Sequence, residues 1–129
     1  EKVHTLKAKI IQIKKLLPGD YVGYNSRHKV DQPTTIGVLN IGYADGFMRR
    51  CGNHRFQVLV NGNKVPVIGN VCMDLSMIDL THAGAVAEGD EVILFGKDLP
   101  IEDMASACDT IPYEILCRIA PRIQRRYTQ

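Results

Sequence analysis

The dipeptide Asn61-Gly62, which stands between two apolar runs, restricts the fold more than any other feature of the sequence. The run before it, residues 55–60, alternates so that three apolar side chains share one face: Phe56, Val58 and Val60. Both central residues of a type I′ turn need a positive φ, which Asn and Gly tolerate. The segment therefore predicts a β-hairpin whose return strand covers residues 64–68, and Pro66 indicates an edge position or a bulge there.

Similar patterns predict strands along the rest of the chain: residues 3–14, 34–41, 75–80, 91–95 and 122–127. In the first of these, alternation places three apolar side chains on one face: Leu6, Ala8 and Ile10. One helix is predicted at residues 99–108. A second, capped by Asp109 or Thr110 and with Pro112 in its first turn, is predicted to end near residue 118. About seven short strands and two short helices predict a mainly-β domain, a small barrel or sandwich.

Bulk composition excludes several classes of protein. The chain of 129 residues is long enough for one domain, and its net charge of +2 is too small to indicate nucleic-acid binding. The basic cluster of Arg122, Arg125 and Arg126 predicts a solvated face. No apolar run approaches the roughly 18 residues of a membrane-spanning helix, so we expect no membrane partner. Because the chain begins at Glu1 without a signal-like segment, we expect a processed or excised piece of a longer protein.

Four cysteines are spread along the chain: Cys51, Cys72, Cys108 and Cys117. They form no CxxC pair, and no histidine stands at zinc spacing from them, so we expect no metal site. The apolar content makes a disulfide scaffold unnecessary. We therefore expect reduced thiols, most of them buried, and a cytoplasmic location.

Residues 42–46, with the sequence GYADG, follow a predicted strand and place a glycine on each side of the tyrosine. Gly42 permits a sharp change of direction, and Asp45-Gly46 is typical of a turn. This pattern predicts that Tyr43 lies at the rim of the sheet with its ring pointing away from the core. The alternative is a half-buried packing residue with only its hydroxyl in water, and the pattern leaves both open.

Two later segments have features of ligand-binding loops. In residues 69–74, a glycine and small apolar residues precede Asp74, which suggests backbone N–H groups open to a partner. A core strand interrupted by a turn is the alternative. In residues 109–114, Tyr113 lies in the first turn of the predicted helix, where unpaired N–H groups suit a phosphate or carboxylate. Ordinary packing is again the alternative, and these patterns alone identify no reaction.

Taken together and in order, these segments resemble the motifs of the alanine racemase C-terminal domain. The matching segments are GYADG at residues 42–46, the segment ending in CMD at residues 69–74, and IPYE at residues 111–114. The flanks agree: HTLKA and KLLPG near the start resemble the beginning of that domain, and the Pro-Arg pair before the basic tail resembles its end. The resemblance covers residues 4–127.

The resemblance implies an enzyme of which this chain is one part. Members of the family carry pyridoxal 5′-phosphate in an N-terminal (β/α)8 barrel, which also contains the lysine that binds it. This chain has no such barrel, since about 250 residues are typical. The resemblance implies a homodimer in which this domain closes the barrel of the second subunit. It implies interconversion of L-alanine and D-alanine for peptidoglycan synthesis, and an isolated domain without activity.

The resemblance also assigns roles to individual residues. Tyr43 would act as the base on one face of the substrate, and the barrel lysine on the other. The backbone of Met73 would meet the substrate carboxylate, and Tyr113 and Ile111 would lie by the cofactor phosphate and the gate of the access channel. Three further residues would support these loops: Asp45, Cys72 and Asp74. The pKa of an ordinary phenol is about 10, so a tyrosine needs cationic neighbours to act as a base near neutral pH. The sequence shows no cation beside Tyr43, and we expect the barrel to supply it.

Some alternatives stay open within this resemblance. A bulky Tyr113 favours alanine over serine, although a racemase of serine or another amino acid is an alternative. At position 70, where some family members have an arginine in the access channel, this chain has Asn70. A non-catalytic β-barrel module for assembly or regulation is a further alternative. The presence of Tyr43, Met73 and Tyr113 argues against a module that kept the fold and lost its catalytic residues.

Overall fold

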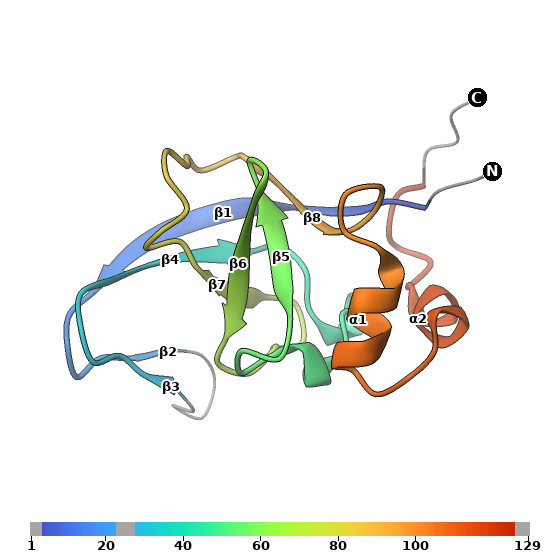
Figure 1. Ribbon diagram of the computed structural model, residues 1–129, viewed down its shortest axis with the longest axis horizontal. Helices are drawn as coiled ribbons and strands as arrows, with labels where there is room; N and C mark the ends of the chain where they lie inside the picture. Colours follow the sequence, from blue (N-terminus) through green and yellow to red (C-terminus); the bar gives the residue numbers. More distant parts are fainter. Residues whose placement is uncertain (1–3, 23–27, 126–129) are drawn as a thin grey trace.

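Six antiparallel strands close into a barrel in the order β1-β4-β7-β6-β5-β8 (Figure 1). The structure is a computed structural model, and it describes residues 4–22 and 28–125. The strands are β1 (Leu6–Leu16), β4 (Thr34–Leu39), β5 (Gln57–Val60), β6 (Asn63–Ile68), β7 (Ser76–Asp79) and β8 (Glu91–Phe95). A separate pair, β2 (Tyr21–Val22) and β3 (His28–Lys29), forms a two-stranded sheet. The predicted mainly-β fold is confirmed, and it is a barrel.

The long strand β1 closes the barrel because it pairs with two neighbours. Its first residues, Leu6 to Lys9, pair with β8, and the residues from Ile10 onward pair with β4, with an irregularity in register between Ile10 and Gln12. The predicted alternation is confirmed. Leu6, Ala8 and Ile10 are buried in the main core, whereas Lys7 and Lys9 face solvent.

The predicted hairpin joins β5 and β6. Asn61 has φ 49° and Gly62 has φ 82°, as a type I′ turn requires, and Val60 pairs with Asn63 across it. The prediction of an edge position or a bulge at Pro66 is wrong, because β6 lies between β5 and β7 in the closed barrel and its register with β5 runs without a shift through this residue. Pairing with β7 begins only at the next residue, so the missing N–H of this proline interrupts no bond to that strand.

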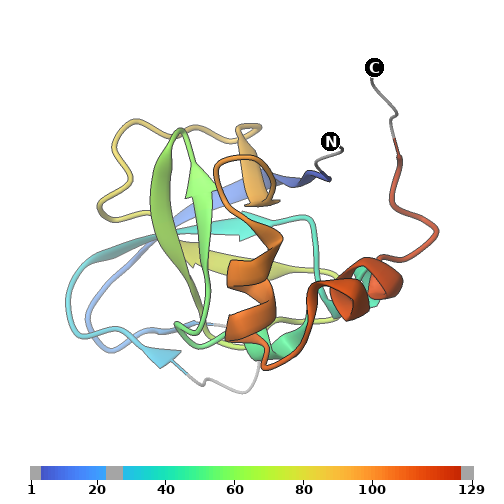
Figure 2. The ribbon, with the colours of Figure 1, turned by 45° about the vertical axis from the view of Figure 1, so that its right-hand side comes forward.

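Two short helices lie at one end of the barrel, α1 (Ile101–Ala107) and α2 (Pro112–Arg118), and Figure 2 shows α1 beside the strands and α2 further out. In the described residues, no helix has the length and apolar character needed to cross a membrane. The predicted cap of α2 is wrong: Ile111 is the N-cap. Asp109 has φ 55° and belongs to the turn, and the Thr110 hydroxyl instead bonds to the Glu114 carboxylate.

The predicted final strand is not formed over residues 122–125, and residues 126 and 127 lie outside the described part of the chain. The physical reason is that β1 and β8 already pair, so the barrel leaves no free edge for another strand. The Arg125 guanidinium instead donates to the carbonyl oxygens of Ile119, Ala120 and Ile123, which holds this segment to the C-terminal end of α2.

Candidate functional site

The segment after β4 carries Tyr43 against the backbone of the CMD segment. The Tyr43 N–H donates to the Cys72 carbonyl, and the Ala44 N–H donates to the Met73 carbonyl, each over 2.9 Å. A Cβ at Gly42 would lie 2.3 Å from the Cys72 oxygen, so only glycine allows this approach. The short 3-10 helix η2 (Tyr43–Asp45) follows directly. Two of the three motifs are therefore in direct backbone contact.

The side chain of Tyr43 lies at the surface, with 42% of its area exposed, so the predicted rim position is confirmed. The guanidinium carbon of Arg49, at the start of the second 3-10 helix η3 (Arg49–Cys51), lies 5.9 Å from the centroid of the tyrosine ring. That contact has the geometry of a cation–π interaction. The expectation that this chain places no cation beside Tyr43 is therefore wrong, because the turn after η2 brings Arg49 back over the ring.

Asp45 is a buried carboxylate rather than an ordinary turn residue, with 5% of its area exposed. Its Oδ2 accepts the Gly42 N–H over 3.1 Å, which holds the turn that presents Tyr43. Its Oδ1 accepts Arg122 Nε over 2.5 Å, and Arg122 Nη2 donates to Asp74 Oδ1 over 2.9 Å. The hydrogen bonds that Arg122 donates to Asp45 and Asp74 raise the pKa of its guanidinium, which stays charged.

Arg122, like Arg49, is a residue of this candidate site that sequence reasoning missed. Its basic neighbours predicted a solvated face, and half of its side chain is indeed exposed, but its guanidinium joins GYADG to CMD. The available signal was Asp45, because a buried carboxylate needs a cationic or hydrogen-bonding partner. Sequence spacing gave no pointer to a partner 77 residues away.

The Met73 loop leaves a donor open at the surface. The side chain of Met73 is 54% exposed, and the Met73 carbonyl oxygen accepts a hydrogen bond from the Ala44 N–H. The loop is closed by a 2.9 Å bond from the Cys72 N–H to the Leu75 carbonyl. Among the hydrogen bonds within residues 4–22 and 28–125, none has the Met73 N–H as donor. This N–H is available to an external acceptor such as a carboxylate.

The third motif reaches the same region through α2. The last residues of α2 pack on the GYADG turn, since a Cβ at Gly46 would lie 2.5 Å from the Arg118 carbonyl oxygen. The Ala120 N–H donates to the Asp45 carbonyl over 3.0 Å. At the other end of this short helix, Ile111 and Tyr113 are 63% and 71% exposed. Five residues of helix rise only about 7.5 Å, so the backbone of Tyr113 lies about that far along the helix axis from the end that packs on this turn.

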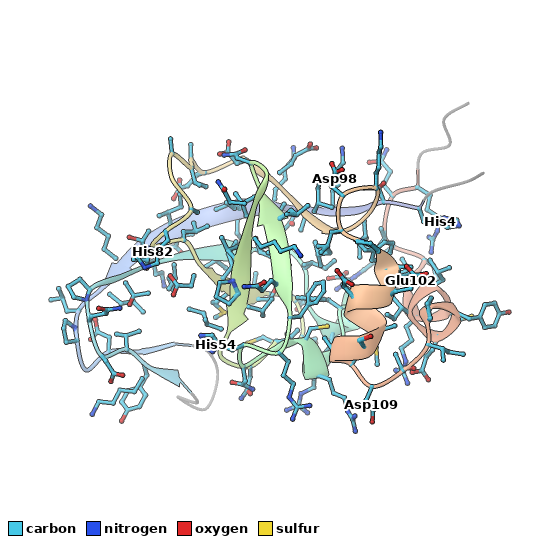
Figure 3. All side chains as sticks on the ribbon, viewed as in Figure 1. His4, His54, His82, Asp98, Glu102 and Asp109 are labelled. Atoms are coloured by element: carbon cyan, nitrogen blue, oxygen red, sulfur yellow. The ribbon has the colours of Figure 1, made fainter. Side chains whose placement is uncertain are left out.

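Other parts of the described chain offer no competing centre. Within residues 4–22 and 28–125, no three His, Cys, Asp or Glu side chains are grouped to hold a metal ion. Figure 3 shows His4, His54 and His82 in different parts of the molecule. Two surface hollows of that region, one lined by residues such as Arg55 and Asp103 and the other by residues such as Lys7 and Asp98, include none of the residues Tyr43, Met73 and Tyr113.

Comparisons with known proteins agree on one family. Residues 3–127 match the model of the alanine racemase C-terminal domain. The chain is 42% identical to alanine racemase 1 of Clostridium acetobutylicum, over 97% of this chain and 33% of that protein. It is 41% identical to the alanine racemase of Chromohalobacter salexigens, over 98% of this chain and 35% of that protein.

Solved structures give the same result. The biosynthetic alanine racemase from Pseudomonas aeruginosa superimposes with a TM-score of 0.91 at 34% identity, over 97% of this chain and 35% of that one. The alanine racemase from Bartonella henselae with covalently bound pyridoxal phosphate gives 0.92 at 34% identity, over 96% and 34%. This chain spans about a third of the length of the relatives that it matches.

Proposed function

Because the chain belongs to the alanine racemase C-terminal domain family, we propose that it is the C-terminal domain of a longer alanine racemase that interconverts L-alanine and D-alanine. The (β/α)8 barrel that completes the site would belong to the rest of that protein. In this proposal the enzyme is a cytoplasmic homodimer that provides D-alanine for peptidoglycan, and this domain serves the active site of the second subunit.

The observation that carries the proposal is the joint placement of Tyr43 and Met73. The phenol is exposed at the rim beside Arg49, and the two hydrogen bonds to Cys72 and Met73 fix the segment that bears it. A fixed and exposed phenol can take or give a proton at the α-carbon of a substrate bound by a neighbouring subunit.

The residues of this chain fit the cofactor only as one wall of its site. Residues 42–46, 69–74 and 111–114 contain no lysine, so none of these motifs can bind pyridoxal 5′-phosphate covalently. That cofactor, when bound by the rest of the protein, supplies the electron sink that makes the α-proton of an amino acid removable. The exposed side chains of Tyr113 and Ile111 would line its surroundings and narrow the access route.

Each remaining step is assigned to residues of this chain. The free Met73 N–H donates to the substrate carboxylate and orients the α-carbon. The Tyr43 oxygen holds or removes the proton on one face, and a base from the barrel serves the opposite face. Tyr113 occupies space that a hydroxymethyl side chain would need, which favours alanine over serine.

Racemisation by full-length variants tests this proposal. We expect Tyr43→Phe to lower kcat/KM by about 100- to 10,000-fold, the usual contribution of a general acid or base. Tyr21→Phe is the matched control, because Tyr21 is also an exposed tyrosine but lies in the small sheet of β2 and β3. An unchanged rate in Tyr43→Phe would favour a non-catalytic barrel module instead.

A further inference from the structure

Two buried cysteines meet next to the functional site without forming a disulfide. The Sγ atoms of Cys51 and Cys108 lie 2.8 Å apart, although 57 residues separate them in the sequence. Both are free thiols, with 0% and 2% of their areas exposed. This pair takes no part in the function proposed above.

The backbone holds both thiols in place. Cys51 is the last residue of η3, and its N–H donates to the Met48 carbonyl. Cys108 caps the C-terminus of α1, and its N–H donates to the Met104 carbonyl. A disulfide bond is about 2.05 Å long, so the sulfur atoms need to approach by less than about 1 Å.

The neighbouring residues join the same two segments. Arg50 precedes Cys51, Asp109 follows Cys108, and their side chains form an ion pair of 3.6 Å. Both partners of this pair are exposed, so it adds little stability. It nevertheless shows that η3 and the end of α1 lie next to each other beside the thiol pair.

The surroundings distinguish the two sulfur atoms. The hydrogen bond with Cys51 lowers the pKa of Cys108, and the guanidinium groups of Arg50 and Arg55 also lower it, whereas burial and the Glu114 carboxylate act in the opposite direction. The same hydrogen bond and burial raise the pKa of Cys51. Of the two thiols, Cys108 is therefore the one that loses its proton more readily, and a thiolate is the form of cysteine that reacts with peroxides.

We propose that Cys51 and Cys108 form a peroxide-dependent intramolecular disulfide. The Cys108 thiolate attacks one oxygen of hydrogen peroxide, the O–O bond breaks, and Cys108 sulfenic acid and hydroxide result. The Cys51 sulfur then attacks the Cys108 sulfur, the S–O bond breaks, and the hydroxyl leaves as water with the Cys51 proton. Overall, two thiols and one hydrogen peroxide give one disulfide and two waters.

The proposed bond would connect two segments that the catalytic proposal uses. Arg49, which lies over the Tyr43 ring, belongs to the same 3-10 helix as Cys51. Cys108 precedes the turn that leads to Ile111 and Tyr113. The bond would therefore link η3, which carries Arg49 over the Tyr43 ring, to the segment before α2. The proposal does not depend on racemase activity.

Peptide mapping of the full-length protein under non-reducing conditions tests the proposal. After treatment with hydrogen peroxide, we expect a linked pair of peptides that contain Cys51 and Cys108, and separate peptides after reduction. The matched controls are Cys72→Ala and Cys117→Ala, which remove the half-buried and the exposed thiol and should leave the link intact.

A reagent specific for sulfenic acid tests the order of the steps. In Cys51→Ala, Cys108 should be labelled after peroxide treatment, whereas Cys51 in Cys108→Ala should stay unlabelled. Peroxide treatment of the unsubstituted protein that leaves both thiols open to alkylation after unfolding would overturn the proposal. A disulfide that instead joins either residue to Cys72 or Cys117 would also overturn it. The peptide mapping uses the unsubstituted protein, so a folding defect in a variant cannot affect its result.

Discussion

The Nε atom of Arg122 lies 2.5 Å from the Oδ1 atom of Asp45, and this ion pair connects the end of the described chain to the turn that presents Tyr43. The same guanidinium reaches Asp74 over 2.9 Å, beside Met73. One cation therefore restrains the loops that carry both proposed functional groups. Because Asp45 is buried and Asp74 is largely exposed, the bond to Asp45 is the more consequential of the two.

We predict that Arg122→Met lowers kcat of the full-length enzyme by roughly 10- to 100-fold, because small displacements of a catalytic group are costly. Arg122→Lys keeps the charge and should recover part of the loss, although lysine cannot span both carboxylates with a planar fork. The control is Arg125→Met, which removes a guanidinium bound only to backbone carbonyls in the described residues. Steady-state kinetics that show equal losses for both methionine variants would contradict a positioning role.

Gly42→Ala tests the contact between the first two motifs. The added Cβ would meet the carbonyl oxygens of Cys72 and Met73 at 2.3 and 2.4 Å, so the backbone must move. We expect a loss of about 1–3 kcal/mol in the free energy of unfolding, as for other overpacked sites, together with reduced activity. At the control Gly96→Ala, the nearest atoms, 3.0 Å away, belong to the Thr5 side chain, and urea titration should show a smaller loss there.

Tyr113→Ser tests the proposed selectivity for alanine. Removal of the exposed ring from the start of α2 makes room for a hydroxymethyl group, and we expect the ratio of kcat/KM for serine to that for alanine to rise by about 10-fold. Tyr21→Ser, on the small separate sheet, should leave the ratio unchanged. Competition between the two amino acids measures this ratio directly, and an unaltered ratio in Tyr113→Ser would refute the role.

Close packing of the barrel core predicts that replacing isoleucine by valine lowers the free energy of unfolding more at a buried position than at an exposed one. Ile78 in β7 has no exposed area, whereas Ile11 in β1 is 50% exposed. Ile78→Val should cost about 0.5–1.5 kcal/mol of unfolding free energy, and Ile11→Val much less. Chemical denaturation of both variants checks the difference. Similar values would mean that Ile78 does not lie in a closely packed interior.

Local pattern was sufficient to predict most of the barrel. Alternation in β1 and the Asn61-Gly62 turn act over a few residues, so the faces and the hairpin follow directly from sequence. The motifs GYADG, CMD and IPYE indicated the family, and the match over residues 3–127 confirms it. The pattern around Tyr43 left a rim position and a half-buried packing position open, and the structure shows the side chain exposed.

Features that depend on distant partners were not predictable from the sequence. Whether residues 122–125 form a strand depends on whether the barrel leaves an open edge, and pairing of β1 with β8 leaves none. Arg122 meets Asp45, and Arg49 meets Tyr43, through turns whose directions no local pattern specifies. The contact of Cys51 with Cys108 has the same origin, because it depends on how α1 packs against η3.

Exchange of the substrate α-hydrogen with solvent deuterium tests most directly whether Tyr43 is the base on one face only. Full-length Tyr43→Ala would be incubated in deuterium oxide with L-alanine or D-alanine separately, and loss of the α-proton followed by NMR. If Tyr43 serves one face, exchange from one enantiomer should persist while exchange from the other falls by about 100-fold or more. Equal rates of exchange from both enantiomers, unchanged from those of the unsubstituted enzyme, would contradict the role assigned to Tyr43.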